Sequence, residues 1–180
     1  MPVVYVAAGS NIEPERNLGR ALAEMRREFR GLRSSAAYRN PAFGFEGADF
    51  INLVVAFETD AALAEVIARL HAIEELCGRP RQAPKWAPRA MDLDILLYGD
   101  QVIDEPGLRL PRADLTSKAY MLRPAAELAP ELRHPVLKRT LGELWQAFDK
   151  TGVRMQPVPL PAEPATSRGS GLHRPPESGR

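Results

Sequence analysis

The pattern of apolar and polar positions predicts alternating strands and helices along the first half of the chain. Strands are predicted from apolar or β-branched runs at 3–11, 32–40, 50–59 and 90–99, of which 32–40 is the weakest. Two segments between these runs repeat apolar residues every three or four positions, which is typical of amphipathic helices. The first helix is expected to begin near Pro14, and the second to be capped by Asp60 and to end at Gly78.

The order of these elements, β-α-β-β-α-β, is the split βαβ pattern of ferredoxin-like α+β folds. It predicts an antiparallel sheet with helices on one face, and leaves the other face free to bind a ligand. A hairpin formed by "QVI" and "LRLP" and two helices near 121–132 and 140–149 are expected to follow as C-terminal additions. Residues 1–150 are therefore predicted to form one domain.

The composition changes from residue 151 onward. Ten of the last thirty residues are proline or glycine, and few are apolar. Such a segment cannot bury enough surface to offset its conformational entropy. Residues 151–180 are therefore expected to form a disordered Pro/Gly-rich tail with no catalytic role.

Composition and charge exclude several classes of function. With 180 residues, 44% hydrophobic and 26% charged, the chain resembles an ordinary soluble globular protein. Its net charge of +1 provides no basic field for nucleic acid or an anionic membrane. The single cysteine, Cys77, excludes an internal disulfide and a cysteine zinc site. With no basic leader and no apolar run of about 18 residues, a cytoplasmic protein is expected.

Two carboxylates interrupt the strand "AMDLDILLYG" at 90–99. Because side chains alternate along a strand, Asp92 and Asp94 share one face, about 7 Å apart. The apolar residues that alternate with them are expected to face the helices: Met91, Leu93, Ile95 and Leu97. Desolvating a bare carboxylate costs several kcal/mol, but two carboxylates could jointly bind Mg²⁺. The alternative is a pair of solvated residues on an edge strand.

Four cations lie in the proline-interrupted segment just before this strand. They accompany Trp86, and they are Arg79, Arg81, Lys85 and Arg89. Guanidinium groups beside paired acids suit a metal-bound polyphosphate, since they form forked hydrogen bonds to phosphate oxygens. The segment could therefore close over such a ligand. The alternative is a solvated loop paired with Glu74 and Glu75.

Four short motifs resemble 6-hydroxymethyl-7,8-dihydropterin pyrophosphokinase, an enzyme family of folate synthesis. They are "YVAAGSN" at 5–11, "YRNPAFG" at 38–44, "DFIN" at 49–52 and "RPRQAPKWAPRAMDLDILLYG" at 79–99. The resemblance runs from about residue 3 to 149. It implies a ferredoxin-like monomer, with a catalytic domain at 1–150, that moves the pyrophosphoryl group of ATP to the pterin hydroxymethyl oxygen and releases AMP. Two Mg²⁺ ions would be the cofactor, and both substrates are small molecules.

The resemblance also implies roles for individual residues. Asp92 and Asp94 match the Mg²⁺-binding aspartates and, with Arg79 and Arg89, would be catalytic. The nucleotide-binding positions would be Arg79, Arg81, Trp86, Arg89, Glu74, His71, Arg112 and Lys118. The pterin-binding positions would be Asn40, Pro41, Phe43, Gly44, Phe50, Asn52 and Tyr120. For Phe50 and Tyr120 the alternative is core packing, and for His71 it is a structural role on its helix.

The chain departs from the family pattern at four positions. Arg112 stands where the family usually has a histidine, Lys118 where it has an arginine, and Ala113 where an aromatic hydroxyl is sometimes found. Gln82 is neutral where a cation is common. Lys118 keeps the positive charge but not the planar fork of arginine. The departures affect ATP affinity, whereas the metal and pterin positions are unchanged.

Two other classes of function remain open. Another Mg²⁺-dependent D-x-D phosphate or nucleotidyl transferase would share the metal and the phosphate donor, but Asn52 with Phe50 and Tyr120 favours a flat heteroaromatic acceptor. A non-enzymatic ferredoxin-like module could bind RNA by stacking bases on aromatic side chains. The open face of the sheet would then present the carboxylates of Asp92 and Asp94 to the RNA phosphates, which is unfavourable.

Overall fold

The computed structural model describes residues 1–42, 46–78 and 90–160. The sheet strands are β1 (Val3–Ser10), β2 (Arg33–Ser34), β3 (Ala37–Asn40), β4 (Phe50–Glu58), β5 (Asp92–Tyr98) and β8 (Gln156–Val158). A separate hairpin pairs β6 (Ile103–Glu105) with β7 (Leu108–Leu110). The helices are α1 (Pro14–Glu28), α2 (Leu63–Leu76), α3 (Asp114–Ser117), α4 (Ala119–Leu128) and α5 (Leu141–Gln146). None of the helices in the described part of the chain is long and apolar enough to cross a membrane.

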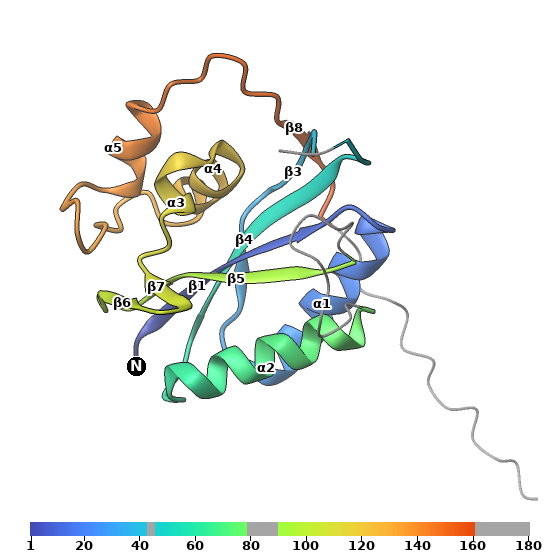
Figure 1. The fold of residues 1–180 in the computed structure, drawn as a ribbon, viewed down its shortest axis with the longest axis horizontal. Coiled ribbons are helices and arrows are strands. Elements are labelled where there is room, and N and C mark those ends of the chain that lie inside the picture. Colours follow the sequence, from blue (N-terminus) through green and yellow to red (C-terminus); the bar gives the residue numbers. More distant parts are fainter. Residues whose placement is uncertain (43–45, 79–89, 161–180) are drawn as a thin grey trace, which may run out of the picture.

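The sheet is antiparallel, and its strand order is β5-β1-β4-β3-β8, with β2 also beside β4. The first four of these strands, with α1 and α2 as their crossovers, have the split βαβ order, which confirms the ferredoxin-like α+β prediction. Figure 1 shows α1 and α2 on one face of the sheet and α3, α4 and α5 on the other. The C-terminal helices are therefore built onto the second face, whereas Leu110 of the hairpin packs in the core beneath α1 and α2.

The second face of the sheet was expected to be free, and this is wrong for the part beneath α4. Tyr5, Val54 and Ala56 of the sheet pack there against Leu122 and Ala125 of α4 in a second apolar core. Helix α4 turns a stripe of small and aliphatic residues toward the sheet, and burying that stripe is favourable. Only the remaining part of this face can carry a site.

Strand β5 contains a bulge that alters the predicted alternation. Tyr5 pairs with Leu97 but Val6 pairs with Ile95, so Leu96 is an extra residue on β5. As a result, Leu97 joins the core beneath α4 instead of the core beneath α1 and α2. The prediction for Leu97 is thus wrong, whereas the other three apolar residues of that set, Met91, Leu93 and Ile95, face α1 and α2 as expected.

Two local predictions around the early elements are also corrected. The weak strand at 32–40 is divided into β2 and β3, because Ser35 interrupts it and uses its backbone and side chain to bond Val54. Helix α2 begins after Ala62 without a side-chain cap, so Asp60 is not its cap. Its predicted end is confirmed, since Gly78 follows it with φ of +89°.

The predicted disordered tail is wrong for residues 151–160. Gln156, Pro157 and Val158 pair with β3, and Val158 packs against the core beneath α1 and α2. Backbone pairing needs few apolar side chains, and a proline is tolerated where an edge strand needs no further donor. Composition alone therefore concealed this strand. Residues 161–180 lie outside the described residues.

A polar cluster fixes α4 to the edge of the sheet. The Tyr38 hydroxyl on β3 donates to the Glu127 carboxylate of α4, 2.6 Å from each oxygen. Arg123 bonds the same carboxylate and lies 4.4 Å from the centre of the Tyr38 ring. Burial, followed by the hydrogen bond to Glu127, raises the pKa of Tyr38 to about 12. The neutral phenol is therefore the form that binds α4.

Replacing Tyr38 with phenylalanine keeps the ring but removes this hydrogen bond, so the free energy of unfolding should fall by about 1–2 kcal/mol at pH 8. Because the pKa is about 12 in the folded protein and about 10 in an unfolded chain, the stabilisation is complete below pH 10 and is lost as pH rises toward 12. Urea unfolding of both proteins from pH 8 to pH 11 measures the difference, which should shrink with pH. A difference that stays constant would contradict the role of the hydroxyl.

Candidate functional site

The candidate site lies on the second face of the sheet, just beyond the part covered by α4. Gly9 of β1 pairs with Asn52 of β4 on one side and with Asp92 of β5 on the other. Directly paired residues of antiparallel strands point to the same face. Asn52 and Asp92 therefore project from the two strands that flank Gly9. The register alone brings a predicted pterin residue and a predicted metal residue to one face.

The next row of paired residues marks the border of this area. Ala7 pairs with Val54 on β4 and with Asp94 on β5. Val54 already belongs to the apolar core beneath α4, whereas Asp94 keeps 25% of its side chain exposed. Asp92 is half-buried as well. The two aspartates thus lie side by side along β5, as the alternation predicted, next to the edge of the α4 cover.

The backbone between the two aspartates is held by a buried carboxylate. The Leu93 N–H donates to Glu74 Oε1 of α2 at 2.7 Å, and Glu74 is only 5% exposed. Strand β5 is at the edge of the sheet, so this amide would otherwise need another partner. Glu74 was assigned to nucleotide binding, and the structure places one of its oxygens against the β5 backbone. His71, one turn earlier on α2, is exposed.

Arg112 is brought to the aspartate pair by the bulge in β5. Its backbone N–H donates to the Leu96 carbonyl, the extra residue of the bulge, at 2.9 Å. Its Nη1 lies 3.2 Å from Asp94 Oδ1, and its Nε lies 3.5 Å from Asp114 Oδ2. The guanidinium therefore neutralises charge between two carboxylates. The resemblance assigned Arg112 to nucleotide binding, whereas the sequence analysis missed Asp114 and this pairing.

The predicted pterin residues Asn40 and Asn52 form a bonded pair. Asn52 Nδ2 donates to Asn40 Oδ1 at 2.7 Å, and Asn40 Nδ2 donates to the Pro41 carbonyl at 3.1 Å. This chain of hydrogen bonds fixes the Asn52 amide, so its Oδ1 remains directed over Gly9. A Cβ added at Gly9 would lie 2.4 Å from that oxygen and 3.8 Å from Phe50 Cδ1. Gly9 is thus a site residue that the sequence analysis missed, although "AGSN" ends the strand at a glycine.

Tyr120 of α4 lies half-buried close to the acidic cluster. Burial raises the pKa of its phenol, and the carboxylates of Asp114 and Asp94 raise it further. The Tyr120 phenol therefore stays uncharged at pH 7, and its hydroxyl can donate a hydrogen bond. Lys118 precedes it at the start of α4.

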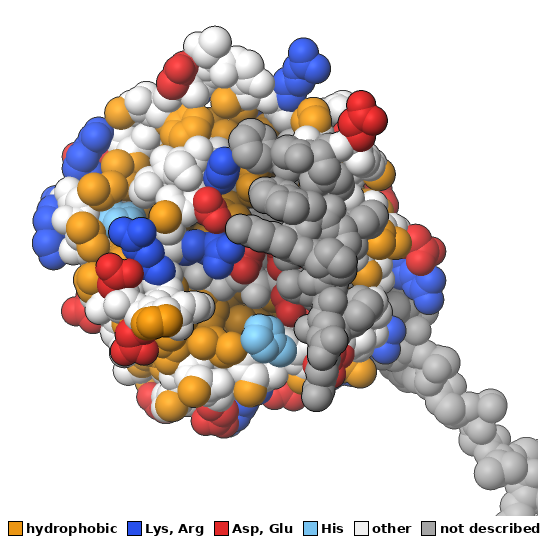
Figure 2. All heavy atoms as spheres, viewed as in Figure 1, with side chains coloured by type: hydrophobic (Ala, Val, Ile, Leu, Met, Phe, Trp, Pro, Cys, Tyr) orange, Lys and Arg blue, Asp and Glu red, His pale blue; other side chains and the backbone are white. Residues whose placement is uncertain are grey.

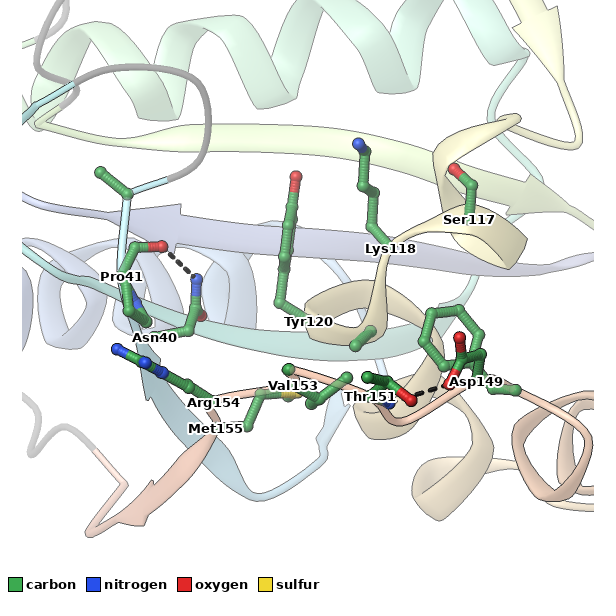
Figure 3. Close-up of a pocket in the computed structure, with 14 residues that line it drawn as sticks. Asn40, Pro41, Ser117, Lys118, Tyr120, Asp149, Thr151, Val153, Arg154 and Met155 are labelled. Atoms are coloured by element: carbon green, nitrogen blue, oxygen red, sulfur yellow. Dashed lines mark hydrogen bonds between the residues drawn. The ribbon is translucent and has the colours of Figure 1, made fainter.

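Four of the predicted residues line one cavity of about 380 Å³, shown in Figure 3. They are Asn40 and Pro41 from the pterin set, Lys118 from the nucleotide set, and Tyr120. The remaining lining comes from Ala42, Ser117, Ala119, Phe148, Asp149 and residues 151–155. Neither Phe50 nor Asn52 lines it. The C-terminal residues of this lining were not predicted, because the segment was interpreted as a tail.

Six predicted site residues lie outside the described residues: Phe43, Gly44, Arg79, Arg81, Trp86 and Arg89. Among the residues described, no group of three or more His, Cys, Asp or Glu side chains could hold a metal ion. Asp92 and Asp94 still fit Mg²⁺, which takes one or two carboxylates and completes its shell with water and phosphate oxygens. On the face seen in Figure 2, acidic and basic side chains lie next to one another near the centre, instead of forming a field of one sign.

Comparisons with known proteins agree on one family. The chain matches the 7,8-dihydro-6-hydroxymethylpterin-pyrophosphokinase family over residues 5–130. It is 39% identical over 158 residues to the 2-amino-4-hydroxy-6-hydroxymethyldihydropteridine pyrophosphokinase of Pseudomonas aeruginosa, covering 86% of this chain and 96% of that protein. The protein of the same name from Aquifex aeolicus is 32% identical over 145 residues, covering 79% of this chain and 90% of the relative.

A solved structure shares the fold. The chain superimposes on Plasmodium falciparum HPPK-DHPS with pteroate at a TM-score of 0.64 and 14% sequence identity. The match covers 81% of this chain and 42% of that longer chain. At this identity the similarity concerns the fold.

Replacing Gly9 with alanine should displace Asn52, because the new Cβ would stand 2.4 Å from its side-chain oxygen. We expect a loss of about 1–3 kcal/mol in the free energy of unfolding, together with a shifted NMR resonance for the Asn52 side-chain amide. Urea unfolding and the NMR spectrum measure the two effects. In the Asn52→Ala background the same substitution should cost much less, and an equal cost in both backgrounds would rule out this contact as the cause.

Proposed function

The chain belongs to the 7,8-dihydro-6-hydroxymethylpterin-pyrophosphokinase family, and we propose how its own residues carry out the family's reaction. It is a pyrophosphokinase of folate biosynthesis, which transfers the pyrophosphoryl group of ATP to 6-hydroxymethyl-7,8-dihydropterin. In this transfer the hydroxymethyl oxygen forms a bond to the β-phosphorus of ATP and loses its proton. The bond from that phosphorus to the α-phosphate oxygen breaks, and AMP leaves.

The observation that carries the proposal is the row Asn52–Gly9–Asp92 across β4, β1 and β5. It places a group suited to a heteroaromatic ring beside a group suited to a phosphate-bound cation. Because the glycine between them has no side chain, the Asn52 amide can lie over β1. This arrangement favours the pyrophosphokinase over an RNA-binding module, because the carboxylates of Asp92 and Asp94 would repel RNA phosphates.

In the phosphate half, Asp92 and Asp94 would hold two Mg²⁺ ions, which supply charge neutralisation for the polyphosphate. Arg112 lies at 3.2 Å from Asp94 and can offer its other guanidinium donors to phosphate oxygens. Lys118, which lines the cavity, adds a second cation. Glu74 would act by holding the β5 backbone at Leu93, so that both aspartates keep their direction.

In the pterin half, Asn52 would recognise the edge of the ring, because an amide both donates and accepts hydrogen bonds. Its partner Asn40 fixes which way the amide points. Phe50 and Tyr120 would enclose the ring from two sides, and Pro41 would border it. The neutral Tyr120 phenol suits this position, since its raised pKa keeps charge away from the ring.

The other assignments complete the proposal. Arg79 and Arg89 would neutralise charge during transfer, and His71 would lie near the nucleotide. The remaining members are Arg81 and Trp86 on the nucleotide side and Phe43 and Gly44 on the pterin side. We also propose that the chain acts in the cytoplasm as a monomer.

The first test of this function replaces each strand carboxylate. Asp92→Asn and Asp94→Asn keep the side-chain shape but remove a ligand charge. We expect each variant to lose several kcal/mol of transition-state stabilisation, so the rate of AMP release should fall steeply. The assay follows AMP formation from ATP with and without the hydroxymethyl pterin, at varied Mg²⁺. Asp104→Asn is the matched control, because that carboxylate is 83% exposed in the separate hairpin. Near-normal AMP release in both strand variants would contradict the metal assignment.

The second test separates the two substrates. Asn52→Ala removes polar contacts to the pterin and should weaken pterin binding by about 1–3 kcal/mol, while ATP binding hardly changes. Titration calorimetry with each ligand measures both affinities. An equal loss for the two ligands would indicate general damage to the sheet instead of a pterin contact.

A further inference from the structure

The C-terminal segment Asp149–Val158 contributes five consecutive residues, 151–155, to the cavity beside Asn40 and Tyr120. We propose that this segment is one wall of the pterin half of the site and positions Asn40 and Tyr120 for the pterin. The proposal rests on the proposed function. It concerns residues beyond 130, where the match to the family model ends.

The route from α5 to this wall is a defined turn. Asp149 Oδ1 accepts from the Thr151 N–H at 2.9 Å, and Val153 N–H donates to the Lys150 carbonyl at 3.1 Å. Gly152 has φ of +72°, a conformation that glycine adopts without strain. Asp149, Thr151 and Gly152 are thus residue types that the turn requires.

Lys150 ties the same turn to the end of α5. Its Nζ donates to the Trp145 carbonyl at 2.9 Å and lies 4.7 Å from the centre of the Trp145 ring. Lysine at a helix C-terminus also complements the helix dipole. The start of the wall is therefore anchored on one side.

The other side of the wall is anchored by pairing with β3. Gln156 pairs with Arg39 and Val158 with Ala37. Continuing this antiparallel register by one residue brings Met155 opposite Asn40, the residue that fixes the Asn52 amide. The segment is therefore held at both ends and passes beside Asn40 of the proposed pterin set.

The side chains of the wall have the chemistry to support a ring. Val153 and Met155 are half-buried and line the cavity with Tyr120. Figure 3 shows Val153, Arg154 and Met155 along one side of the cavity, with Tyr120 above them and Asn40 and Pro41 next to Arg154. In the proposal, the apolar atoms on this side limit how far Tyr120 and Asn40 can move. Pterin affinity should depend on the wall more than ATP affinity does, because Asp92, Asp94 and Arg112 are absent from the cavity lining and Lys118 alone of the described nucleotide positions lies in it.

The experiment fills the cavity in the full-length protein. Val153→Trp adds a large side chain at the wall, so we expect the Kd for 6-hydroxymethyl-7,8-dihydropterin to rise at least about tenfold, the Kd for MgATP to stay within about twofold, and Tm to be unchanged. Gln156→Trp is the matched control, since Gln156 is exposed on β8 and does not line the cavity. It should bind both ligands as the unmodified chain does.

A milder pair of variants tests positioning if the tryptophan lowers Tm. Val153→Ala should raise the pterin Kd several-fold with MgATP binding unchanged. Val153→Ile keeps a branched apolar side chain and should leave the pterin Kd close to that of the unmodified chain. Unchanged pterin affinity in both Val153→Trp and Val153→Ala, or an equal loss for pterin and MgATP, would overturn the wall while the function stands. If the unmodified chain neither binds the pterin nor releases AMP, the proposed function itself fails.

Discussion

The site depends on the pairing register of β1, the strand that lies between β4 and β5. Because side chains alternate along a strand, moving β1 by one residue would exchange its two faces. Val4, Val6 and Ala8 are buried beneath α1 and α2, so the register is fixed by the burial of these side chains. The same register places Gly9 between Asn52 and Asp92. The core packing of one face thus determines the chemistry of the other.

Charge at the site is balanced by contacts that come from separate parts of the chain. A half-buried carboxylate such as Asp94 needs compensation, which Arg112 supplies at 3.2 Å. Arg112 reaches it because the bulge at Leu96 leaves a carbonyl for its backbone N–H. The departure from the family histidine therefore puts a permanent cation next to Asp94, one of the two proposed metal ligands. If phosphate or metal left the site, Asp94 would still be paired with Arg112.

The sequence predicted the core of the fold and the location of the aspartates, since both follow from strong local periodicity. Leu97 was assigned to the wrong face because a run of apolar residues, "ILLY", does not show which one is extra at a bulge. Arg112 pairs with Asp94, about 18 residues earlier in the chain. The Leu93 N–H donates to Glu74, about 19 residues earlier. No local pattern in the sequence encodes either contact. The strand at 156–158 was missed because its stability comes from backbone pairing and from Val158, a single apolar contact.

The proposed division of the second face into a phosphate half and a pterin half would let one small sheet serve two substrates. The phosphate half is built on β5 and the segment that follows it, whereas the pterin half is built on β3, β4 and α4. Tyr38 and Glu127 hold α4 to β3, so the enclosing residue Tyr120 and the bonded pair of Asn40 and Asn52 belong to one connected unit. The two proposed halves adjoin at β1, whose Gly9 contributes no side chain, and at the cavity that Lys118 shares with Asn40 and Tyr120. Tyr120 also links the two halves electrostatically, since the carboxylates of Asp114 and Asp94 add to burial in raising the pKa of its phenol. A change of charge around Asp94 therefore reaches the proposed pterin half through Tyr120, whereas the bonded pair of Asn40 and Asn52 keeps its own geometry.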